Sequence, residues 1–392
     1  MARSTHRLLR KRTDEIASVS FSELLFDLIY IFAVTQLSHY LLHNLTWLGL
    51  IQETLLWFAV WLGWQHTTWV TNWFNPNTRA IRTLLFILMI VGLIMSSSIP
   101  EAFAYRGIIF AMCYVTIQLG RTICILFILG NNHQLTANFR RIFGWFVISA
   151  VFWIWGGLEE GNFRIALWGI GVLIDYTSPM HGFYLPILGR SDPSKEWTIE
   201  GHHLIERSQL FVIIAFGETI LMTGASLSEF EEWNTPVILA ALVSFLSSLA
   251  MWWIYFDTSS EAGSEKIRKT ENPGWLGFKY HAIHVVLVGA LIYCAVGDEM
   301  VVNHPHGHIS YGAIFTLIVG PIIYLLANMV YKWFTCRIIA VSHMVAIAAF
   351  ILLAFFTGHM TLLTINAIGV LIFIIVGAYE TLQSRKNKRV EE

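Results

Sequence analysis

Stretches of about 20 mainly apolar residues recur along the whole chain, separated by short polar breaks. A helix that crosses a bilayer needs about 20 such residues, and its backbone polar groups must be hydrogen-bonded within the segment because lipid offers no partners. Of the 392 residues, 56% are hydrophobic and only 13% are charged. A soluble core cannot hide that many apolar side chains, so the pattern predicts an all-α, polytopic transmembrane helix bundle.

Gly, Pro, Asn and charged residues divide the apolar stretches into about 12 predicted spans. They lie near residues 20–43, 47–72, 81–99, 104–130, 141–158, 162–188, 202–226, 235–257, 277–297, 309–331, 336–357 and 360–381. The basic segment before the first span resembles a signal peptide. The span itself is long, carries two acidic residues and has no clear cleavage site, so we expect it to be retained.

Charge is distributed unevenly between the connecting segments. With the N-terminus in the cytoplasm, all but four of the 25 Lys and Arg residues fall in cytoplasmic segments; the exceptions are Arg106, Arg121, Arg164 and Arg207. The outer loops carry acidic residues instead, namely Glu101, Glu159, Glu160, Glu229, Glu231, Glu232, Asp298 and Glu299. Because Lys and Arg concentrate in short cytoplasmic loops, both termini are predicted to be cytoplasmic.

The two halves of the chain resemble each other. The sequence Ile-Gly-Val-Leu-Ile occurs at 170–174 and again at 368–372, and shorter matches follow the same order with a similar spacing. This predicts two six-helix repeats, which are parallel because six is an even number. The expected organisation is a basic cytoplasmic tail (1–19), a first repeat (20–190), a cytoplasmic linker (191–201), a second repeat (202–381) and a cytoplasmic tail (382–392).

Several ionisable or strongly polar residues lie inside the predicted spans. A charge near the bilayer centre costs at least about 2.5–3.5 kcal/mol, so such residues normally face protein or water. The candidates for binding or proton handling are Glu23, Asp27, Gln36, His39, Asp175, Glu206, Arg207 and Glu218. Gln65, His66, His202, His203, Asp257, His281 and His284 are also intramembrane, and many members of both groups lie toward the cytoplasmic leaflet.

Two interpretations of this cluster stay open. Pairs such as Glu206 with Arg207, or Glu23 with Arg121, can be ion pairs that only fix helix packing. Alternatively, the carboxylates and histidines line a cavity for protons, ions or a polar solute, as intramembrane clusters of this kind commonly do. If the duplication is real, we expect Glu23 and Glu206 to lie at equal depth and to face each other across the repeat interface, within reach directly or through water and Arg207.

A metal site is a weaker alternative. His202 and Glu206 are four residues apart on one helical face, and His281 and His284 are three apart on another, so two helices offer up to four ligands. No HExxH motif accompanies them. The four cysteines show no CxxC pairing, no cofactor motif is present, and with a net charge of -1 nucleic acid is an unlikely class of partner.

Two long motifs resemble a known family. Residues 19–39 read VSFSELLFDLIYIFAVTQLSH, and residues 203–221 read HLIERSQLFVIIAFGETIL. Both are similar to the hallmarks of the bacterial low-temperature-requirement A family, with Ser208-Gln209 departing from the usual aromatic-Gly pair. The resemblance implies a bacterial polytopic membrane protein without a settled substrate. It therefore places the chain in the cytoplasmic (inner) membrane.

The leading hypothesis is a transporter-like protein with a polar, proton-coupled central site. Its expected partners are membrane lipid and an unidentified small solute or ion. An ion channel is the first alternative, because the same acidic groups would attract cations to a pore. A membrane-embedded, metal-dependent lipid enzyme is the second. We found no nucleophile elbow and no phosphate-binding loop, so an enzyme is not the expected class.

Overall fold

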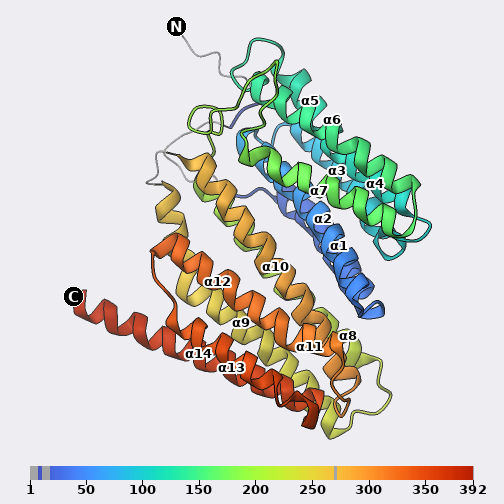
Figure 1. Cartoon of the computed structure of the whole chain (residues 1–392). Coiled ribbons are helices and arrows are strands. Elements are labelled where there is room, and N and C mark those ends of the chain that lie inside the picture. Colours follow the sequence, from blue (N-terminus) through green and yellow to red (C-terminus); the bar gives the residue numbers. More distant parts are fainter. Residues whose placement is uncertain (1–7, 11–17, 269–271, 392) are drawn as a thin grey trace. The chain divides into compact units, whose positions relative to one another are not determined.

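The computed structural model describes residues 8–10, 18–268 and 272–391, and every regular element in these ranges is helical (Figure 1). The chain forms two compact units. Unit 1 comprises Met1–Tyr40, Leu48–Arg207 and Ile267–Lys279, and unit 2 comprises Leu41–Trp47, Ser208–Lys266 and Tyr280–Glu392. Helix α8 belongs to unit 1 as far as Arg207 and to unit 2 from Ser208 onward.

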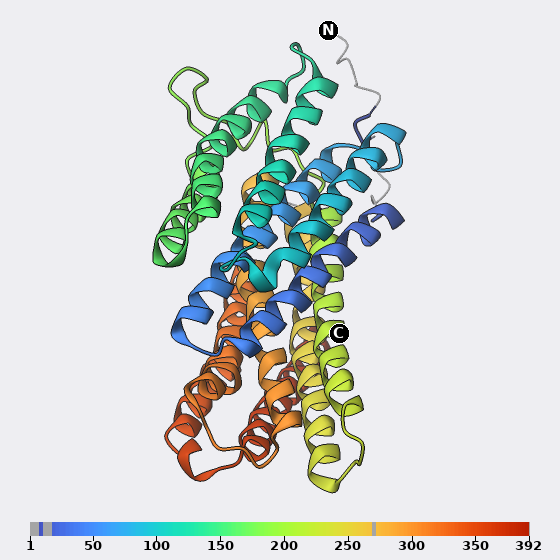
Figure 2. The same ribbon diagram turned by 90° about the vertical axis from the view of Figure 1, so that its right-hand side faces the viewer.

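Unit 1 is built on the first seven α-helices. They are α1 (Phe21–His43), α2 (Trp47–Trp73), α3 (Arg79–Ser98), α4 (Gly107–Val115), α5 (Arg121–Leu129), α6 (Thr136–Leu158) and α7 (Gly161–Met180). Helices α6 and α7 form a hairpin and lie side by side (Figure 2), and α4 packs on α6. The first turns of α8 (Gly201–Ser228) complete the unit beside α1 and α2.

Unit 2 contains the rest of α8 and the helices that follow it. They are α9 (Thr235–Arg268), α10 (Pro273–Asn303), α11 (Tyr311–Ile314), α12 (Gly320–Cys336), α13 (Val341–Ala354) and α14 (Leu362–Glu391). Helix α13 packs against α12 and α14, which precede and follow it in the sequence. Within this unit Asp298 of α10 is buried, 1% exposed, and accepts a hydrogen bond from Asn366 Nδ2 at 2.9 Å.

Two spans are interrupted by π-helical turns. The segment Thr116–Gly120 joins α4 to α5, and Phe315–Val319 joins α11 to α12. A π turn inserts one residue into the α-helical ladder and shifts the side chains that follow around the helix axis. Arg121 begins α5 directly after the first of these turns, so the turn sets the direction of its side chain.

Nine helical segments of the described chain are long and apolar enough to cross a membrane. The expected number of about 12 spans is therefore not confirmed. Helices α2 and α7 are not among the nine. Helix α2 carries Glu53, Gln65 and His66, and helix α7 carries Arg164 and Asp175. Helix α13 has only 14 residues, so the span predicted at 336–357 is too long. Residues 336–340 divide between the end of α12 and a short loop.

The predicted end of the ninth span, at residue 297, is wrong. Hydropathy places Asp298 and Glu299 in the loop after this span, but α10 continues to Asn303 and contains both residues. The acidic pair interrupts the apolar run, and hydropathy therefore ended the predicted span too early. Burial of Asp298 is possible because Asn366 on another helix supplies a hydrogen-bond donor.

Aromatic side chains form the centre of unit 1. Trp57, Trp61 and Trp64 on α2 are at most 2% exposed, and neighbouring pairs of their rings lie 5.5 and 4.8 Å apart between centroids. The tryptophan side chains of α2 therefore pack within the protein. Trp153 and Trp168 of α6 and α7 are fully buried in the same unit.

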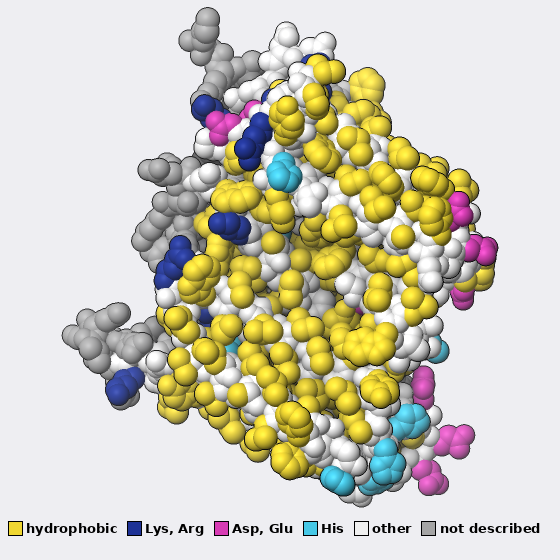
Figure 3. Space-filling view, viewed as in Figure 1, with side chains coloured by type: hydrophobic (Ala, Val, Ile, Leu, Met, Phe, Trp, Pro, Cys, Tyr) yellow, Lys and Arg dark blue, Asp and Glu magenta, His cyan; other side chains and the backbone are white. Residues whose placement is uncertain are grey.

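The outer faces of the helices are apolar. Helix α3 exposes Phe86, Ile87, Ile90, Leu93 and Ile94, each between 45% and 63% exposed. Figure 3 shows hydrophobic side chains over most of the visible surface, and within unit 1 taken by itself the basic side chains gather at one end of the helices, whereas acidic side chains lie at the other end and also beside the basic ones. A surface of this kind is stable in lipid and would aggregate in water.

Candidate functional site

The start of α1 is a capping box that places Glu23 inside the protein. Ser20 precedes the helix, and its backbone N–H and hydroxyl both donate to Oε2 of Glu23 at 2.9 Å. The backbone N–H of Glu23 in turn points at the Ser20 hydroxyl, 3.4 Å away. The sequence Ser-x-x-Glu favours this arrangement because it satisfies donors that a helix start leaves free. It fixes a fully buried carboxylate at the first turn.

The start of α8 is held in a similar way by Glu200 and Asn72. The Glu200 carboxylate accepts from the backbone N–H of His202 at 3.3 Å and of His203 at 2.5 Å. Oδ1 of Asn72 accepts from the Glu200 N–H at 2.8 Å, and Nδ2 of Asn72 donates to the Glu200 carbonyl at 2.7 Å. These two bonds fix the orientation of the Asn72 amide.

The orientation of Asn72 determines the tautomer of His203. Nδ2 of Asn72 also lies 3.2 Å from Nδ1 of His203, so Nδ1 is the acceptor. Nε2 therefore carries the hydrogen and donates to Oε1 of Glu23 at 3.0 Å. His203 is fully buried and neutral in this arrangement, and it joins α8 to α1.

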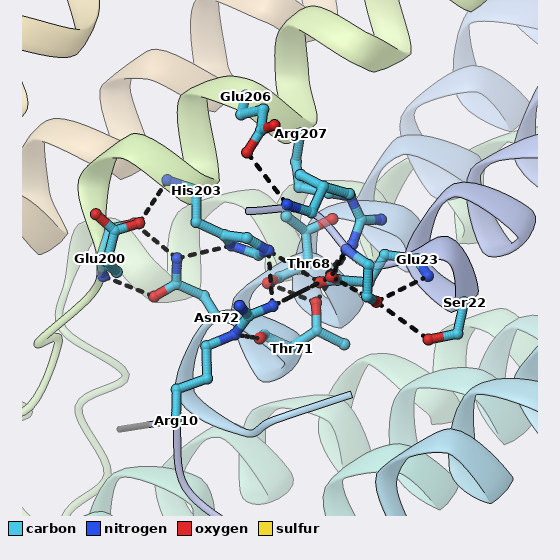
Figure 4. A network of polar contacts seen from close by, with 12 residues as sticks. Arg10, Ser22, Glu23, Thr68, Thr71, Asn72, Glu200, His203, Glu206 and Arg207 are labelled. Carbon is cyan, nitrogen blue, oxygen red and sulfur yellow. Dashed lines mark hydrogen bonds and ion pairs between the residues drawn. The ribbon is translucent and has the colours of Figure 1, made fainter. Parts of the chain in front are cut away.

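Arg207 of α8 binds two carboxylates of α1, of which that of Glu23 is labelled in Figure 4. Its Nη1 lies 3.0 Å from Oε1 of Glu23, and its Nη2 donates to Oδ1 of Asp27. Trp64 of α2 donates to the same Oδ1 at 2.7 Å, and its ring faces the guanidinium at 5.9 Å. Glu23 and Asp27 are four residues apart on one helical face, which is the spacing that lets one guanidinium reach both.

The short N-terminal segment adds a second cation. Leu8 and Arg10 form backbone hydrogen bonds with Asn75 and Trp73 at the end of α2. Nη2 of Arg10 then lies 3.1 Å from Oε2 of Glu23, and its Nε donates to the Thr71 carbonyl at 2.7 Å. Nη2 is also 2.9 Å from Nε2 of His203, because both donors converge on one carboxylate.

This network contains two positive and two negative side chains, so its charges balance. The cations are Arg10 and Arg207, and the anions are Glu23 and Asp27. All its members belong to unit 1. Glu23 is saturated with donors, whereas Oδ2 of Asp27 and Nε of Arg207 are buried without a hydrogen-bond partner in the part of the chain that the structure describes. An unpartnered carboxylate oxygen is a vacant position for a proton or a donor from a ligand.

Glu206 does not pair with Glu23 directly. Its Oε2 accepts the backbone N–H of Val19 at 3.2 Å, just before α1. No hydrogen bond or ion pair in the described chain joins the two glutamates. Glu23 also makes no ion pair with Arg121, and Glu206 makes none with Arg207. The sequence indicated the right helix ends, but the ion pairs that it suggested as one interpretation are not among those of the described residues.

The remaining predicted residues lie elsewhere. Gln36 is half-buried and His39 is exposed, both further along α1 in unit 1. Asp175 of α7 is buried in unit 1 and accepts from the Tyr114 hydroxyl at 2.7 Å and from Trp153 Nε1 at 3.1 Å. Glu218 is a buried residue of α8 in unit 2. These residues are not members of the Arg207 network.

The predicted metal ligands make other contacts. His284 has both ring nitrogens in hydrogen-bond contact, with the Tyr255 hydroxyl at 2.7 Å and the Tyr280 carbonyl at 2.8 Å. His284 and His281 belong to unit 2, whereas His202 and Glu206 belong to unit 1. Across the described ranges, no group of three or more His, Cys, Asp or Glu side chains is placed to hold a metal ion.

Sequence reasoning missed several members of the network: Arg10, Thr71, Asn72, Glu200 and Trp64 as a hydrogen-bond donor. Only the capping-box spacing of Ser20 and Glu23 was a readable signal for the local geometry of α1. Arg10 was counted as one of many basic residues of a cytoplasmic tail. Its contact depends on how the chain passes the end of α2, which no local pattern reveals.

The apolar helices and the buried ion network define a multi-pass integral membrane protein. The chain matches the family described as bacterial low temperature requirement A protein (LtrA) over residues 18–378. It is also 35% identical over 393 aligned positions to an uncharacterised protein of Rhizobium meliloti (strain 1021), covering 98% of this chain and 94% of that protein. No solved structure matches. The chain belongs to the LtrA family.

Proposed function

We propose that this protein is a proton-coupled, transporter-like protein of the bacterial inner membrane, with Asp27 as the group that takes up and releases the proton. The observation that carries the proposal is the unpartnered Oδ2 of Asp27 beside Arg207. Asp27 is fully buried and lies in the second turn of a membrane helix. Ionisable groups in this position commonly serve proton and ion pathways.

Protonation of Asp27 would change the forces on α8. The neutral acid no longer attracts Arg207 as an ion, and the charge balance of the network is lost. A buried charge pair that loses one charge costs about 3–5 kcal/mol, which is enough to shift an equilibrium between two arrangements of helices. Glu23 keeps its hydrogen bonds to Ser20 and His203 meanwhile, so it holds the helix ends.

We infer an internal duplication, which would support a transporter-like architecture. Among the described residues, each half of the chain has six helical segments when helices joined by π turns are counted as one. The π turns Thr116–Gly120 and Phe315–Val319 fall in the fourth segment of each half, with a spacing similar to that of the two Ile-Gly-Val-Leu-Ile sequences. Parallel six-helix repeats are a known plan for secondary transporters. We infer two such repeats, with both termini in the cytoplasm.

The test is flux in reconstituted vesicles. Full-length protein in liposomes that contain a pH-sensitive dye is given an inward proton gradient and a panel of small solutes. We expect solute-dependent proton movement with the wild type and none with Asp27→Asn. The amide keeps Oδ1 as an acceptor for Trp64 and Arg207 but cannot titrate.

Glu160→Gln, at an exposed position before α7, is the control and should keep wild-type flux. Full activity of Asp27→Asn would remove Asp27 from the proposal. Absence of flux for every solute with the wild type would contradict coupled transport.

A further inference from the structure

A buried carboxylate in unit 2 lies beside a small cavity. Asp298 of α10 is 1% exposed, and its Oδ1 accepts the hydrogen bond from Asn366 Nδ2 at 2.9 Å. Its Oδ2 is buried and has no hydrogen-bond partner among the described residues. The cavity that Asp298 lines has a volume of about 10 Å³, which is room for a single water-sized guest. It therefore fits one small ion and no organic molecule.

The negative charge of Asp298 has no counter-charge at this cavity. Asp298 is the one Asp, Glu, Lys, Arg or His among the described residues that line it. Lys332, a buried cation of the same unit, forms its ion pair with Glu380 instead. Buried charges in proteins are normally paired or bind a metal ion. A single carboxylate is balanced by one monovalent cation.

The π turn Phe315–Val319 leaves a backbone oxygen without its helical donors. The N–H of Gly320 is the usual α-helical donor to the Thr316 carbonyl, but it bonds to the Phe315 carbonyl. The next residue, Pro321, would be the π-helical donor and has no N–H. The Thr316 carbonyl therefore loses both backbone donors that α- and π-helices provide. In membrane transporters, carbonyls released from a helix in this way coordinate Na⁺.

Close packing brings this turn against α10 beside the carboxylate. A Cβ on Gly297, the residue before Asp298, would lie 3.2 Å from the Thr316 Cβ and 3.3 Å from its carbonyl carbon. Thr316, Ser247 of α9 and Asn366 of α14 line the same cavity as Asp298. Three further elements thus supply oxygen-bearing groups around one small space. Oxygen atoms are the ligands that hard cations prefer.

We propose that this cavity binds one Na⁺ ion, with Asp298 as its charged ligand. The Thr316 carbonyl and the Ser247 hydroxyl supply neutral oxygen ligands. The part of the chain that the structure describes holds no group of three or more His, Cys, Asp or Glu side chains placed to bind a metal. Zn²⁺ requires such a group, whereas Na⁺ does not. The site goes beyond proton uptake by Asp27, because it rests on other residues in the other unit.

The experiment measures binding of radiolabelled Na⁺ to purified full-length protein in detergent by a scintillation proximity assay. Unlabelled Na⁺ should displace the label saturably, the larger K⁺ should do so about tenfold less well, and choline should not compete. Asp298→Asn should abolish saturable binding, because the amide keeps an acceptor for Asn366 but carries no charge. The matched control is Asp175→Asn, a carboxylate that is also 1% exposed but lies in unit 1, which should keep wild-type affinity.

Pro321→Ala is the second variant, since it restores an N–H that can bond to the released carbonyl. We expect it to weaken Na⁺ binding severalfold, while the unfolding temperature without Na⁺ should not fall. The competition assay on wild-type protein needs no variant to fold. No saturable Na⁺ binding, K⁺ binding as tight as that of Na⁺, or unchanged binding by Asp298→Asn would each overturn the proposal. No gradient is applied, so none of these outcomes bears on proton flux through Asp27.

Discussion

Nη1 of Arg207 lies 3.0 Å from Oε1 of Glu23, a residue 184 positions earlier in the chain. This ion pair joins the first turn of α1 to the second turn of α8, and both side chains are at most 1% exposed. At this depth water cannot take the place of a lost partner, so the remaining charge would stay buried and unpaired. The pair therefore determines both the packing of two helix ends and the charge balance around Asp27.

We expect Arg207→Gln to lower the free energy of unfolding by about 3–5 kcal/mol, because two buried carboxylates lose their common cation. Thermal unfolding in detergent, followed by size-exclusion chromatography with fluorescence detection, measures the change. Arg82→Gln, at an exposed site on α3, should change it by less than about 0.5 kcal/mol. Similar stability of the two variants would show that the Arg207 network contributes nothing to folding.

A double-mutant cycle tests the contact itself. Glu23→Gln and Arg207→Gln should each destabilise the protein, and the double variant should lose less than the sum. The expected coupling energy is about 0.5–3 kcal/mol. The same cycle with Asp175→Asn in place of Glu23→Gln should show strict additivity, since Asp175 bonds to Tyr114 and Trp153 instead. Additivity in both cycles would contradict the ion pair.

Glu206→Gln should leave the folded protein intact. Within the described residues this carboxylate accepts one hydrogen bond, from the Val19 N–H, and an amide oxygen accepts that bond equally well. Unfolding temperature should therefore match the wild type, while any role of Glu206 in proton handling appears as lost flux in liposomes. A large loss of stability would mean that its negative charge, not only its acceptor, supports the start of α1.

Two glycine substitutions separate close helix packing from helix propensity. A Cβ on Gly157 of α6 would lie 2.9 Å from the Ala111 Cβ and 3.1 Å from the Ile108 Cα of α4. Gly157→Ala should thus destabilise the protein by about 1–3 kcal/mol through overpacking. At Gly169 of α7 a Cβ meets nothing within 4 Å, so Gly169→Ala should be neutral or stabilising by up to about 1 kcal/mol. The reverse order of unfolding temperatures would contradict the α4–α6 contact.

Orientation in the membrane is testable with single cysteines. The four native cysteines are replaced by Ala, and a cysteine is introduced at Asn132 or at Glu231, which are exposed loop positions. A membrane-impermeant maleimide should label Glu231→Cys on intact cells. Asn132→Cys should react only after permeabilisation, because its loop is cytoplasmic under the positive-inside rule. The opposite labelling pattern would invert the proposed topology.

Hydropathy alone predicted the helical class and the bounds of many helices within a few residues. Helix α1 begins one residue after its expected start, and α8 one residue before. The hydropathy rule worked because an apolar run is read from neighbouring residues. It was wrong at Asp298, since an acidic residue ends a hydropathy window whether or not a distant amide satisfies it.

The sequence by itself determined that the chain is a bundle of membrane helices and that Glu23, Asp27 and Arg207 lie near two helix starts. Only the tertiary structure decided their partners: Arg207 reaches both carboxylates, Glu206 binds a backbone N–H, and Arg121 faces a cavity instead of Glu23. The physical reason is that hydropathy is a property of consecutive residues. The partner of a buried charge depends on how each helix is rotated about its axis, and packing across the bundle sets that rotation.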